Sequence, residues 1–191
     1  NISKPILVLL PGSRQQEINR HWNIILDAVS ELLKINKDIQ VVIGKSKNVF
    51  IETIPDNFKL EENSKKAIIS ATAAITCSGT ATLECAVEDT PMVVCYKLST
   101  ISWYIAKIVS KVQYSSIVNL ILNKKIVTEL LQNKMNSKNI IEEIIPLLDL
   151  KSFKRKKMLS DFSKIRKTLG IPGVYNRTAS LIISKTKTFN N

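Results

Sequence analysis

Leu9–Ile18 reads LLPGSRQQEI, and this stretch decides the fold. The apolar run Ile6–Leu10 predicts a strand, Gly12–Arg14 predicts a turn, and a helix is expected to start directly after it. A helix N-terminus offers unpaired backbone N–H groups and a partial positive charge. Gly12 lets a ligand approach the backbone, and Arg14 adds a permanent, forked cation that suits phosphate. The stretch therefore predicts an anion pocket between a strand and a helix.

A second segment of the same kind, Ala73–Glu84, reads AAITCSGTATLE. Both loops are expected beyond the carboxyl ends of strands, where open α/β sheets bind ligands. Ser78, Gly79 and Thr80 are expected to present backbone N–H groups and hydroxyls to a diphosphate, and Glu84 to accept hydrogen bonds from ribose hydroxyls. Each of these residues alone would serve a tight turn or a helix cap equally well. The pair of loops, and not either one, carries the prediction.

The rest of the chain alternates strand-like apolar runs with segments of helical period, which is typical of βαβ units around a mostly parallel sheet. We therefore predict an α/β, Rossmann-like sheet flanked by helices. The expected strands are 6–10, 40–43, 73–76 and 92–96. The expected helices are 17–35, 64–70, 80–87, 100–110, 128–131, 137–145, 151–169 and 175–185, with 114–122 irregular or extended and 45–57 unassigned.

Length and composition set the outer limits of the interpretation. With 191 residues, of which 45% are apolar, the chain can bury a full core. We expect one domain over 1–150, and helices over 151–191 that pack on it or on a missing N-terminal domain. No uninterrupted run reaches the roughly 18 apolar residues of a membrane-spanning helix. The first residues lack an initiator Met and a signal-peptide pattern, so the chain is expected to be the interior of a longer protein.

The charge is strongly basic, with 28 Lys and Arg against 16 Asp and Glu, a net +12. Much of the excess falls in Lys151–Lys157 and Lys164–Lys167. A solvated helix face explains these runs most simply, and a contact with an anionic membrane surface comes second. Few aromatic residues accompany the charge and no nucleic-acid motif is visible, so no nucleic-acid partner is expected.

No cofactor or metal is expected. The three cysteines Cys77, Cys85 and Cys95 have no zinc spacing, and the single histidine, His21, is not close to them in sequence. They are therefore expected to be buried and reduced, and His21 and Trp22 to be structural. The G-x-G-x-x-G and Walker patterns are both absent, which disfavours a dinucleotide cofactor and an ATPase.

Five motifs in order resemble one known family. They are Leu10–Arg14 with Glu17, Ser78–Glu84, Pro91–Val94 with Tyr96–Lys97, Tyr114–Ser116 with Asn119, and Ile126–Gln132. In order and spacing they are similar to the C-terminal half of lipid-A-disaccharide synthase, over roughly the first two thirds of the chain. Other UDP-sugar enzymes, such as an N-acetylglucosaminyltransferase or an epimerase, and a basic nucleic-acid-binding module remain as alternatives.

The resemblance implies one domain of a two-domain, inverting glycosyltransferase of the GT-B type. Such an enzyme transfers 2,3-diacylglucosamine from UDP-2,3-diacylglucosamine to 2,3-diacylglucosamine 1-phosphate, in the cytoplasm at the inner face of the inner membrane. The family's general base belongs to the N-terminal domain, which is missing here. By the resemblance, this chain alone binds UDP without turnover and without a metal.

The resemblance also implies site residues. Arg14 and the loop Ser78–Thr80 would hold the diphosphate and neutralise charge on the leaving UDP, Glu84 would hold the ribose, and Asn119 would lie near the sugar or phosphate. The full set of substrate-binding candidates is Gly12, Ser13, Arg14, Glu17, Ser78, Gly79, Thr80, Thr82, Glu84, Asn119 and Gln132.

Overall fold

A computed structural model describes residues 4–46, 48–77, 79–99, 103, 113–171 and 173–188. Its centre is a sheet of six parallel strands in the order β3-β2-β1-β4-β5-β6. The strands are β1 (Ile6–Leu10), β2 (Gln40–Gly44), β3 (Lys59–Glu61), β4 (Ala73–Thr76), β5 (Met92–Tyr96) and β6 (Thr128–Leu131). The strand order reverses between β1 and β4, which is the switch point where ligands bind in such sheets.

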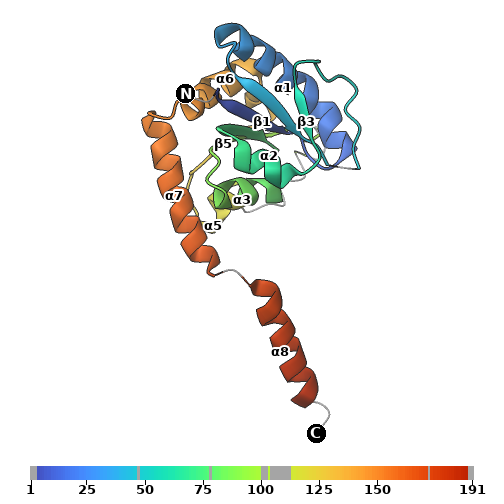
Figure 1. Ribbon diagram of the computed structural model, residues 1–191, viewed down its shortest axis with the longest axis vertical. Helices are drawn as coiled ribbons and strands as arrows, with labels where there is room; N and C mark the ends of the chain where they lie inside the picture. Colours follow the sequence, from blue (N-terminus) through green and yellow to red (C-terminus); the bar gives the residue numbers. More distant parts are fainter. Residues whose placement is uncertain are drawn as a thin grey trace.

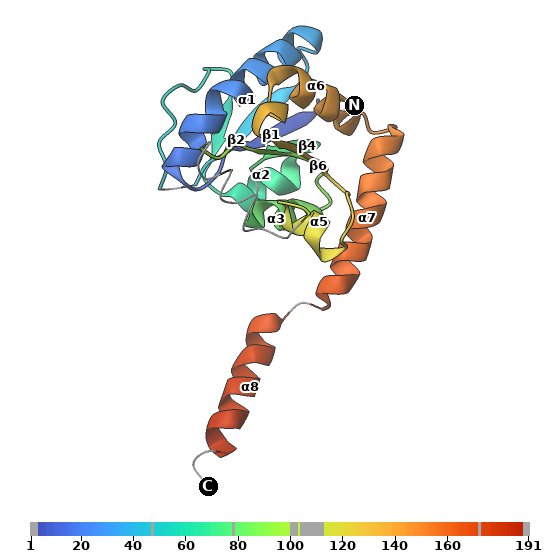
Figure 2. The same ribbon diagram turned by 180° about the vertical axis from the view of Figure 1, so that it is seen from behind.

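Helices cover both faces of the sheet. The described helices are α1 (Gln15–Ile35), α2 (Ser64–Ser70), α3 (Thr80–Val87), α5 (Ile117–Ile121), α6 (Ser137–Leu148), α7 (Phe153–Leu169) and α8 (Val174–Thr188), with a 3-10 turn at Gln132–Lys134. The pair α1 and α6 packs on one face, and α2, α3 and α5 lie on the other (Figures 1 and 2). The result is a three-layer α/β fold.

The sheet is apolar on both sides because helices cover both faces. Leu7, Val8 and Leu9 are fully buried in β1, and Val8 lies between Val42 and Ala74 of the neighbouring strands. On α1, buried residues recur at helical spacing and form one apolar stripe toward the sheet. They are Ile18, His21, Trp22, Ile25, Ala28, Val29 and Leu32. This packing fixes the two ends of α1, and with them the loop that precedes it.

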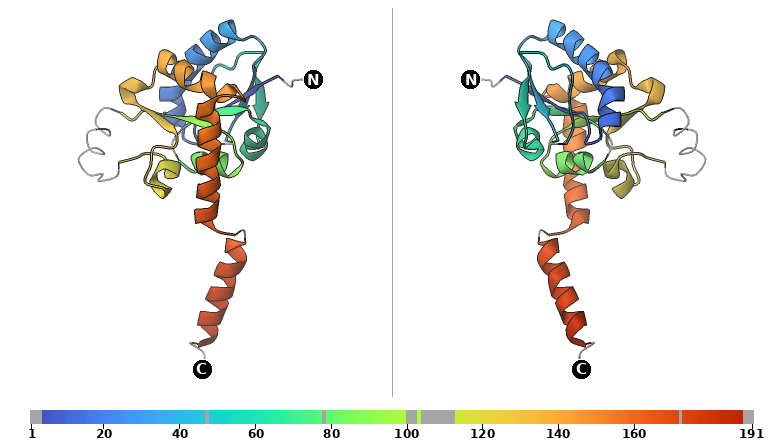
Figure 3. Two further views of the ribbon diagram at one scale, coloured as in Figure 1. Left: turned by 90° about the vertical axis from the view of Figure 1, so that its left-hand side faces the viewer. Right: turned by 90° about the vertical axis from the view of Figure 1, so that its right-hand side faces the viewer.

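The last two helices differ from each other. The helix α7 packs against α3, α5 and α6 and buries Met158, Phe162 and Ile165. The helix α8 extends away from the sheet, and its side chains from Val174 to Ser184 are exposed (Figure 3). Within the described residues, none of the helices combines the length and apolar character needed to cross a bilayer.

The α/β prediction is confirmed, and so are most of the expected elements. The strands 6–10, 73–76 and 92–96 and the helices 64–70 and 80–87 have the predicted bounds. The helix expected at 17–35 begins two residues earlier, and those expected at 137–145 and 175–185 are longer at their C-terminal ends. The expected helix 100–110 lies outside the described residues except for Trp103, whose N–H donates to the Ser99 carbonyl at 2.9 Å.

Two predictions were wrong, and one strand was not expected. Residues 128–131 form the edge strand β6 and not a helix, because pairing with β5 outweighs the local helix preference of Glu129–Leu131. The second half of 114–122 is the short helix α5, which Ser116 caps by accepting from the Asn119 N–H. The three-residue strand β3 at Lys59–Glu61 carries no apolar pattern that would predict it.

Candidate functional site

A cavity of about 1050 Å³ lies at the carboxyl ends of the strands. Leu10, Gly44 and Cys77 come from or directly follow the ends of β1, β2 and β4 and form part of its lining. Both predicted loops also contribute to it. Of the candidates named from the sequence, the cavity is lined by Gly12, Ser13, Arg14, Glu17, Gly79, Thr80 and Glu84. Arg14 and Glu84 therefore face the same space.

Two of the helices that begin at this cavity, α1 and α3, lack a side-chain cap. The N-cap residues Arg14 of α1 and Gly79 of α3 make no side-chain hydrogen bond to the first turn. By contrast, α2, α5, α6 and α7 are capped by Asn63, Ser116, Asn136 and Ser152. Because the first N–H groups of a helix need acceptors, α1 and α3 direct unsatisfied donors and two partial positive charges toward one cavity. This arrangement suits an anion with two acceptor groups, such as a diphosphate.

The loop before α1 is shaped by Gly12 and Glu17. Gly12 has φ +116°, and a Cβ at this position would meet Glu17 Oε2 at 2.7 Å. The Glu17 carboxylate accepts a hydrogen bond from the Tyr96 hydroxyl at 3.3 Å and lies 3.7 Å from Arg14 Nη1. The Arg14 side chain is 79% exposed, so Glu17 holds it only weakly. Arg14 is thus available to a ligand in the cavity.

The second loop offers a different chemistry. Gly79 has φ +129° and no atom within 4 Å of where its Cβ would lie, so its backbone is open to a ligand. Glu84 is exposed one turn into α3 and faces the cavity. A carboxylate accepts hydrogen bonds only, which fits vicinal hydroxyls. Lys45 adds a second cation on the far side of β1.

Three candidates do not line the cavity. Thr82 is buried and donates its hydroxyl to the Gly79 carbonyl at 2.7 Å. Gln132 accepts from the Leu98 N–H at 3.1 Å, and Leu98 does line the cavity. Thr82 and Gln132 therefore support the walls of the cavity. Ser78 lies outside the described residues.

Asn119, the third such candidate, is fully buried beneath the wall next to β6. Its Oδ1 accepts from the N–H groups of Ile126 and Val127, at 2.7 and 3.0 Å. Its Nδ2 donates to the Val127 carbonyl at 3.0 Å and to Glu129 Oε1 at 2.8 Å. The carboxamide is thus fully engaged within the protein. In this structure Asn119 supports the wall instead of facing the cavity.

Glu129 is a residue that the sequence reasoning did not single out. Its carboxylate accepts the Ser115 and Ser116 N–H groups at 2.8 and 3.0 Å and the Ser116 hydroxyl at 2.8 Å. Ser115 and its neighbour Tyr114 line the cavity, together with Trp103 and Gln113. The pairing of Glu129 with the segment 114–116 was not visible in the sequence, because it depends on β6 being a strand.

Cys77 forms part of the floor of the cavity, and the buried His21 lies beneath it. His21 is fully buried, and burial lowers its pKa from the ordinary 6.5, with an opposing effect from the backbone of Lys97. Burial also raises the pKa of the Cys77 thiol well above its usual value. Cys85 and Cys95 are buried free thiols, and burial raises the pKa of each to about 12. The expected burial of all three cysteines is confirmed, and none of them is a reactive thiolate.

Within the described ranges, no three His, Cys, Asp or Glu residues lie close enough together to hold a metal ion. The charged groups that line the cavity are Arg14, Glu17, Lys45, Glu62 and Glu84. Arg14, Lys45 and the N–H groups of α1 and α3 can bind an anion, and the carboxylates can accept hydrogen bonds from hydroxyls.

Comparison with known proteins identifies the family. The family model for lipid-A-disaccharide synthetase matches residues 1–182. The chain belongs to the lipid-A-disaccharide synthetase family. Among family members, the lipid-A-disaccharide synthase of Myxococcus xanthus is 30% identical over 94% of this chain, and that of Prochlorococcus marinus is 31% identical over 96%. The chain spans about half the length of these relatives, 49% and 50%.

Solved structures similar to this chain include several glycosyltransferases and a putative UDP-N-acetylglucosamine 2-epimerase from Listeria monocytogenes, which has a TM-score of 0.55 at 14% identity and covers 82% of this chain and 39% of its own. The glycotransferase of kitacinnamycin has a TM-score of 0.61 at 13% identity, covering 95% of this chain and 43% of its own. A spinosyn rhamnosyltransferase has the same TM-score at 12% identity, covering 94% and 45%. The fold of the family member described here is therefore a Rossmann-like domain of the GT-B type.

Proposed function

We propose that the chain is the nucleotide-sugar-binding domain of an inverting glycosyltransferase. The enzyme would transfer 2,3-diacylglucosamine from UDP-2,3-diacylglucosamine to 2,3-diacylglucosamine 1-phosphate. The observation that carries the proposal is the pair of uncapped helices, α1 and α3, which begin at one cavity. Membership of the lipid-A-disaccharide synthetase family supports the choice of substrate.

In this proposal the first turns of α1 and α3 bind the diphosphate through their free N–H groups. Arg14 reaches over the same phosphates, and it stabilises the charge that builds on UDP as the glycosidic bond breaks. Because Arg14 is exposed and its distance to Glu17 is long, it can move toward the ligand at little cost. Glu84 accepts hydrogen bonds from the ribose hydroxyls, one helical turn beyond Thr80.

The acceptor site and the general base would be supplied by the part of the enzyme that this chain does not match in its relatives. We therefore expect the isolated chain to bind UDP and to form no disaccharide. Disaccharide formation by this chain alone would refute that division of labour. No metal takes part in the proposed binding, because the donors come from helix N-termini and from Arg14.

Calorimetric titration with UDP tests the proposal directly. UDP is expected to bind more tightly than inorganic pyrophosphate, since only UDP reaches Glu84. Each of Arg14→Ala and Glu84→Ala should weaken UDP binding by about tenfold or more, the effect of losing one charge-assisted hydrogen bond. Arg14→Ala should weaken the binding of pyrophosphate by the same factor, whereas Glu84→Ala should leave the binding of pyrophosphate unchanged.

The matched control is Glu88→Ala. Glu88 is also an acidic residue of the α3 region, but it follows the last turn, pairs with Lys65 at 3.4 Å and does not line the cavity. The Glu88→Ala variant should bind UDP as tightly as the unaltered chain. If UDP bound no better than pyrophosphate, and the Arg14 and Glu84 changes had no effect, the proposed function would be wrong.

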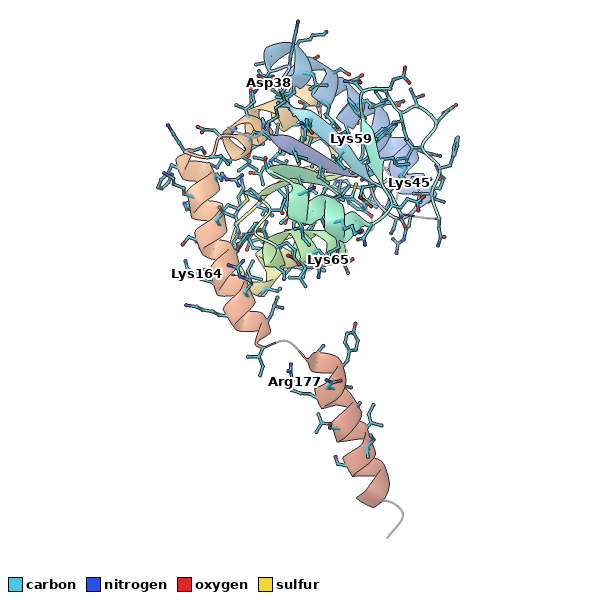
Figure 4. The ribbon with its side chains drawn as sticks, viewed as in Figure 1. Asp38, Lys45, Lys59, Lys65, Lys164 and Arg177 are labelled. Atoms are coloured by element: carbon cyan, nitrogen blue, oxygen red, sulfur yellow. The ribbon has the colours of Figure 1, made fainter. Side chains whose placement is uncertain are left out.

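A contact with an anionic membrane surface is the second part of the proposal. Several basic side chains of α7 are engaged within the protein: Lys154 with Glu143, Lys164 with Asp161 and Arg166 with Asp89. Within the described ranges, no ion pair involves the exposed Lys151, Lys156, Lys157 or Lys167. Figure 4 shows Lys164 on the surface of α7.

An exposed aromatic side chain accompanies these lysines. Phe153 is 79% exposed at the start of α7, beside Leu150 at 63%. Exposed apolar residues among unpaired lysines suit the interface of an anionic bilayer. From the resemblance to the family, we propose that the enzyme acts in the cytoplasm at the inner face of the inner membrane, where its lipid-bearing substrates would lie.

Vesicle sedimentation tests this contact. The chain should pellet with vesicles that contain anionic lipid and should remain in solution with neutral vesicles, and added salt should reverse the pelleting. A double variant with Lys156→Glu and Lys157→Glu should lose most of the pelleting with anionic vesicles. The paired position Lys154 is unsuited as a control because it supports folding, so Lys34→Glu on α1 serves instead. Equal pelleting with both kinds of vesicle would exclude the electrostatic contact.

For the last helix, α8, we propose that the remainder of the enzyme covers it. Its apolar residues Leu181, Ile182 and Ile183 are 64%, 59% and 55% exposed in this chain. Such a cluster on an extended helix fits an intramolecular interface better than solvent.

A further inference from the structure

A buried series of hydrogen bonds under the cavity floor connects the two loops. His21, on α1, lies with its Nδ1 3.0 Å from the Cys77 Sγ. The Cys77 thiol in turn donates to the Pro11 carbonyl oxygen at 3.0 Å. Pro11 directly precedes Gly12, and Cys77 stands two residues before Gly79. His21 and Cys77 thus join the backbone of one loop to the backbone of the other.

The contacts of the ring fix its protonation state. The Lys97 N–H donates to His21 Nε2 at 2.8 Å. A backbone N–H can only donate, so Nε2 carries no proton and the neutral ring is protonated at Nδ1. Nδ1–H then donates to Cys77 Sγ, and the thiol hydrogen is directed to Pro11. The Nδ1–H tautomer therefore satisfies every donor and acceptor in this series of hydrogen bonds.

A second proton on the ring would have to bind at Nε2. It would face the Lys97 N–H at 2.8 Å, so that two donors would point at each other. The Lys97 carbonyl oxygen lies 3.2 Å from Nε2, within hydrogen-bond reach, and favours that proton, but the Lys97 N–H would still face it unless this segment of backbone turns. Lys97 follows Tyr96, which lines the cavity and holds Glu17. Protonation would therefore displace one wall of the cavity as well as its floor.

The surroundings keep the ring neutral. Around it, the titratable and charged residues are Glu17 and Arg20 on α1, Cys77 after β4, and Tyr96 and Lys97 at the end of β5. Burial lowers the pKa of His21 most strongly, and Arg20 acts in the same direction. The Lys97 backbone and Glu17 act in the opposite direction without cancelling it. The neutral form therefore dominates at pH 7 and above.

We propose that neutral His21 is a positioning residue that fixes the two diphosphate-binding loops relative to each other, and that a second proton on its ring releases them and weakens nucleotide-sugar binding. This inference rests on the proposed function, because it takes the ligand to be a nucleoside diphosphate sugar. It adds a condition to that function: the site is assembled only while the ring is neutral.

The test is calorimetry with UDP-N-acetylglucosamine from about pH 8 to about pH 5, across the range in which histidine titrates. A UDP-sugar is the probe because a terminal phosphate, as in UDP, itself titrates near about pH 6. For the unaltered chain we expect binding to weaken by about tenfold on the acid side, the effect of one lost buried hydrogen bond.

Two variants separate positioning from general stability. His21→Gln keeps a neutral acceptor near the Lys97 N–H, so it should bind severalfold more weakly than the unaltered chain at pH 8 and show no acid loss. Thr90→Val removes a buried hydroxyl that donates to the Ile68 carbonyl at 2.8 Å, in a residue outside the cavity lining. It should lower the melting temperature and keep the acid loss.

The ring can also be observed directly, because His21 is the single histidine of the chain. Nitrogen-15 NMR of the full chain should show the Nδ1–H tautomer, and the midpoint of its titration should coincide with the midpoint of the binding loss. An Nε2–H tautomer, a flat binding profile through the titration, or an unchanged acid loss in His21→Gln would each overturn the inference. Absence of binding at pH 8 would instead overturn the proposed function, and this inference with it.

Discussion

Asn119 shows how a polar side chain can serve a site without facing it. The resemblance to the family placed it near the sugar or phosphate, and direct contact stays a prediction. In the structure its carboxamide holds three backbone groups of Ile126 and Val127 and the carboxylate of Glu129. Glu129 in turn holds the Ser115 and Ser116 N–H groups. Asn119 therefore acts on the cavity through its wall.

Replacing Asn119 by Ala should cost about 2–4 kcal/mol of unfolding free energy, because buried backbone groups lose their partners. Urea denaturation measures this loss. Gln132→Ala is the comparison, since it removes a single hydrogen bond to the Leu98 N–H and should cost about 1 kcal/mol. Equal stability of Asn119→Ala and the unaltered chain would show that the carboxamide is free to face a ligand.

Single residues were predictable where their chemistry is local. Gly12, Arg14 and Gly79 stand at turns between a strand and a helix, and a turn of this kind is visible in a few consecutive letters. The link between His21 and Cys77 was not predictable, since 56 positions separate the two. The same holds for Glu129 and Ser115, whose contact depends on strand pairing.

At the scale of elements, the buried central strands were the easiest to predict. β1 and β5 are continuous apolar runs, and their bounds agree with the prediction. β6 lies at the edge of the sheet and contains Glu129 and two leucines, which favour a helix locally. Pairing with β5 makes the segment 128–131 a strand. β3 is short and polar, so only its pairing with β2 makes it a strand.

The docking of α7 depends on a buried carboxylate. Asp161 is 4% exposed and accepts hydrogen bonds from Lys124, in the turn after α5, and from Lys164 on its own helix. Burial alone would raise the pKa of Asp161, but the hydrogen bonds from Lys164 and Lys124 outweigh it and lower the pKa below the ordinary 3.8. Asp161 thus stabilises the fold only while it is ionised.

The sign of the pH dependence follows from this lowered pKa. The stabilising contribution of Asp161 should be complete above about pH 4 and should be lost as the pH falls through its lowered pKa. Thermal melts between about pH 2 and about pH 7 measure it. Asp161→Asn should lower stability near neutral pH and flatten the acid side of the curve. An Asn variant that keeps the acid-side slope of the unaltered chain would assign that slope to other carboxylates.

At the scale of the whole molecule, the two C-terminal helices should respond differently to truncation. Ending the chain at Gly170 removes α8, whose side chains from Val174 to Ser184 are exposed. The melting temperature should then change by less than about 2 °C, because little buried surface is lost. Self-association should fall, since exposed Leu181, Ile182 and Ile183 are removed.

Ending the chain at Lys151 also removes α7, and with it the buried Met158, Phe162 and Ile165. That loss should unfold the domain or lower its melting temperature strongly, since each large buried side chain contributes roughly 2–5 kcal/mol. Circular dichroism during heating compares the two truncations. A large loss on removing α8 alone would mean that this helix folds back onto the domain in solution.

The all-parallel sheet separates the start of β1 from the cavity. β1 begins at Ile6, at the amino ends of the strands. Leu10 reaches the cavity at their carboxyl ends, about 13 Å away at the usual rise of a strand. A biosensor surface tethered at the Ile6 end of β1 would accordingly leave the ligand entrance turned toward the flowing solution. Kinetic measurements of nucleotide capture can use that attachment without blocking the mouth of the pocket.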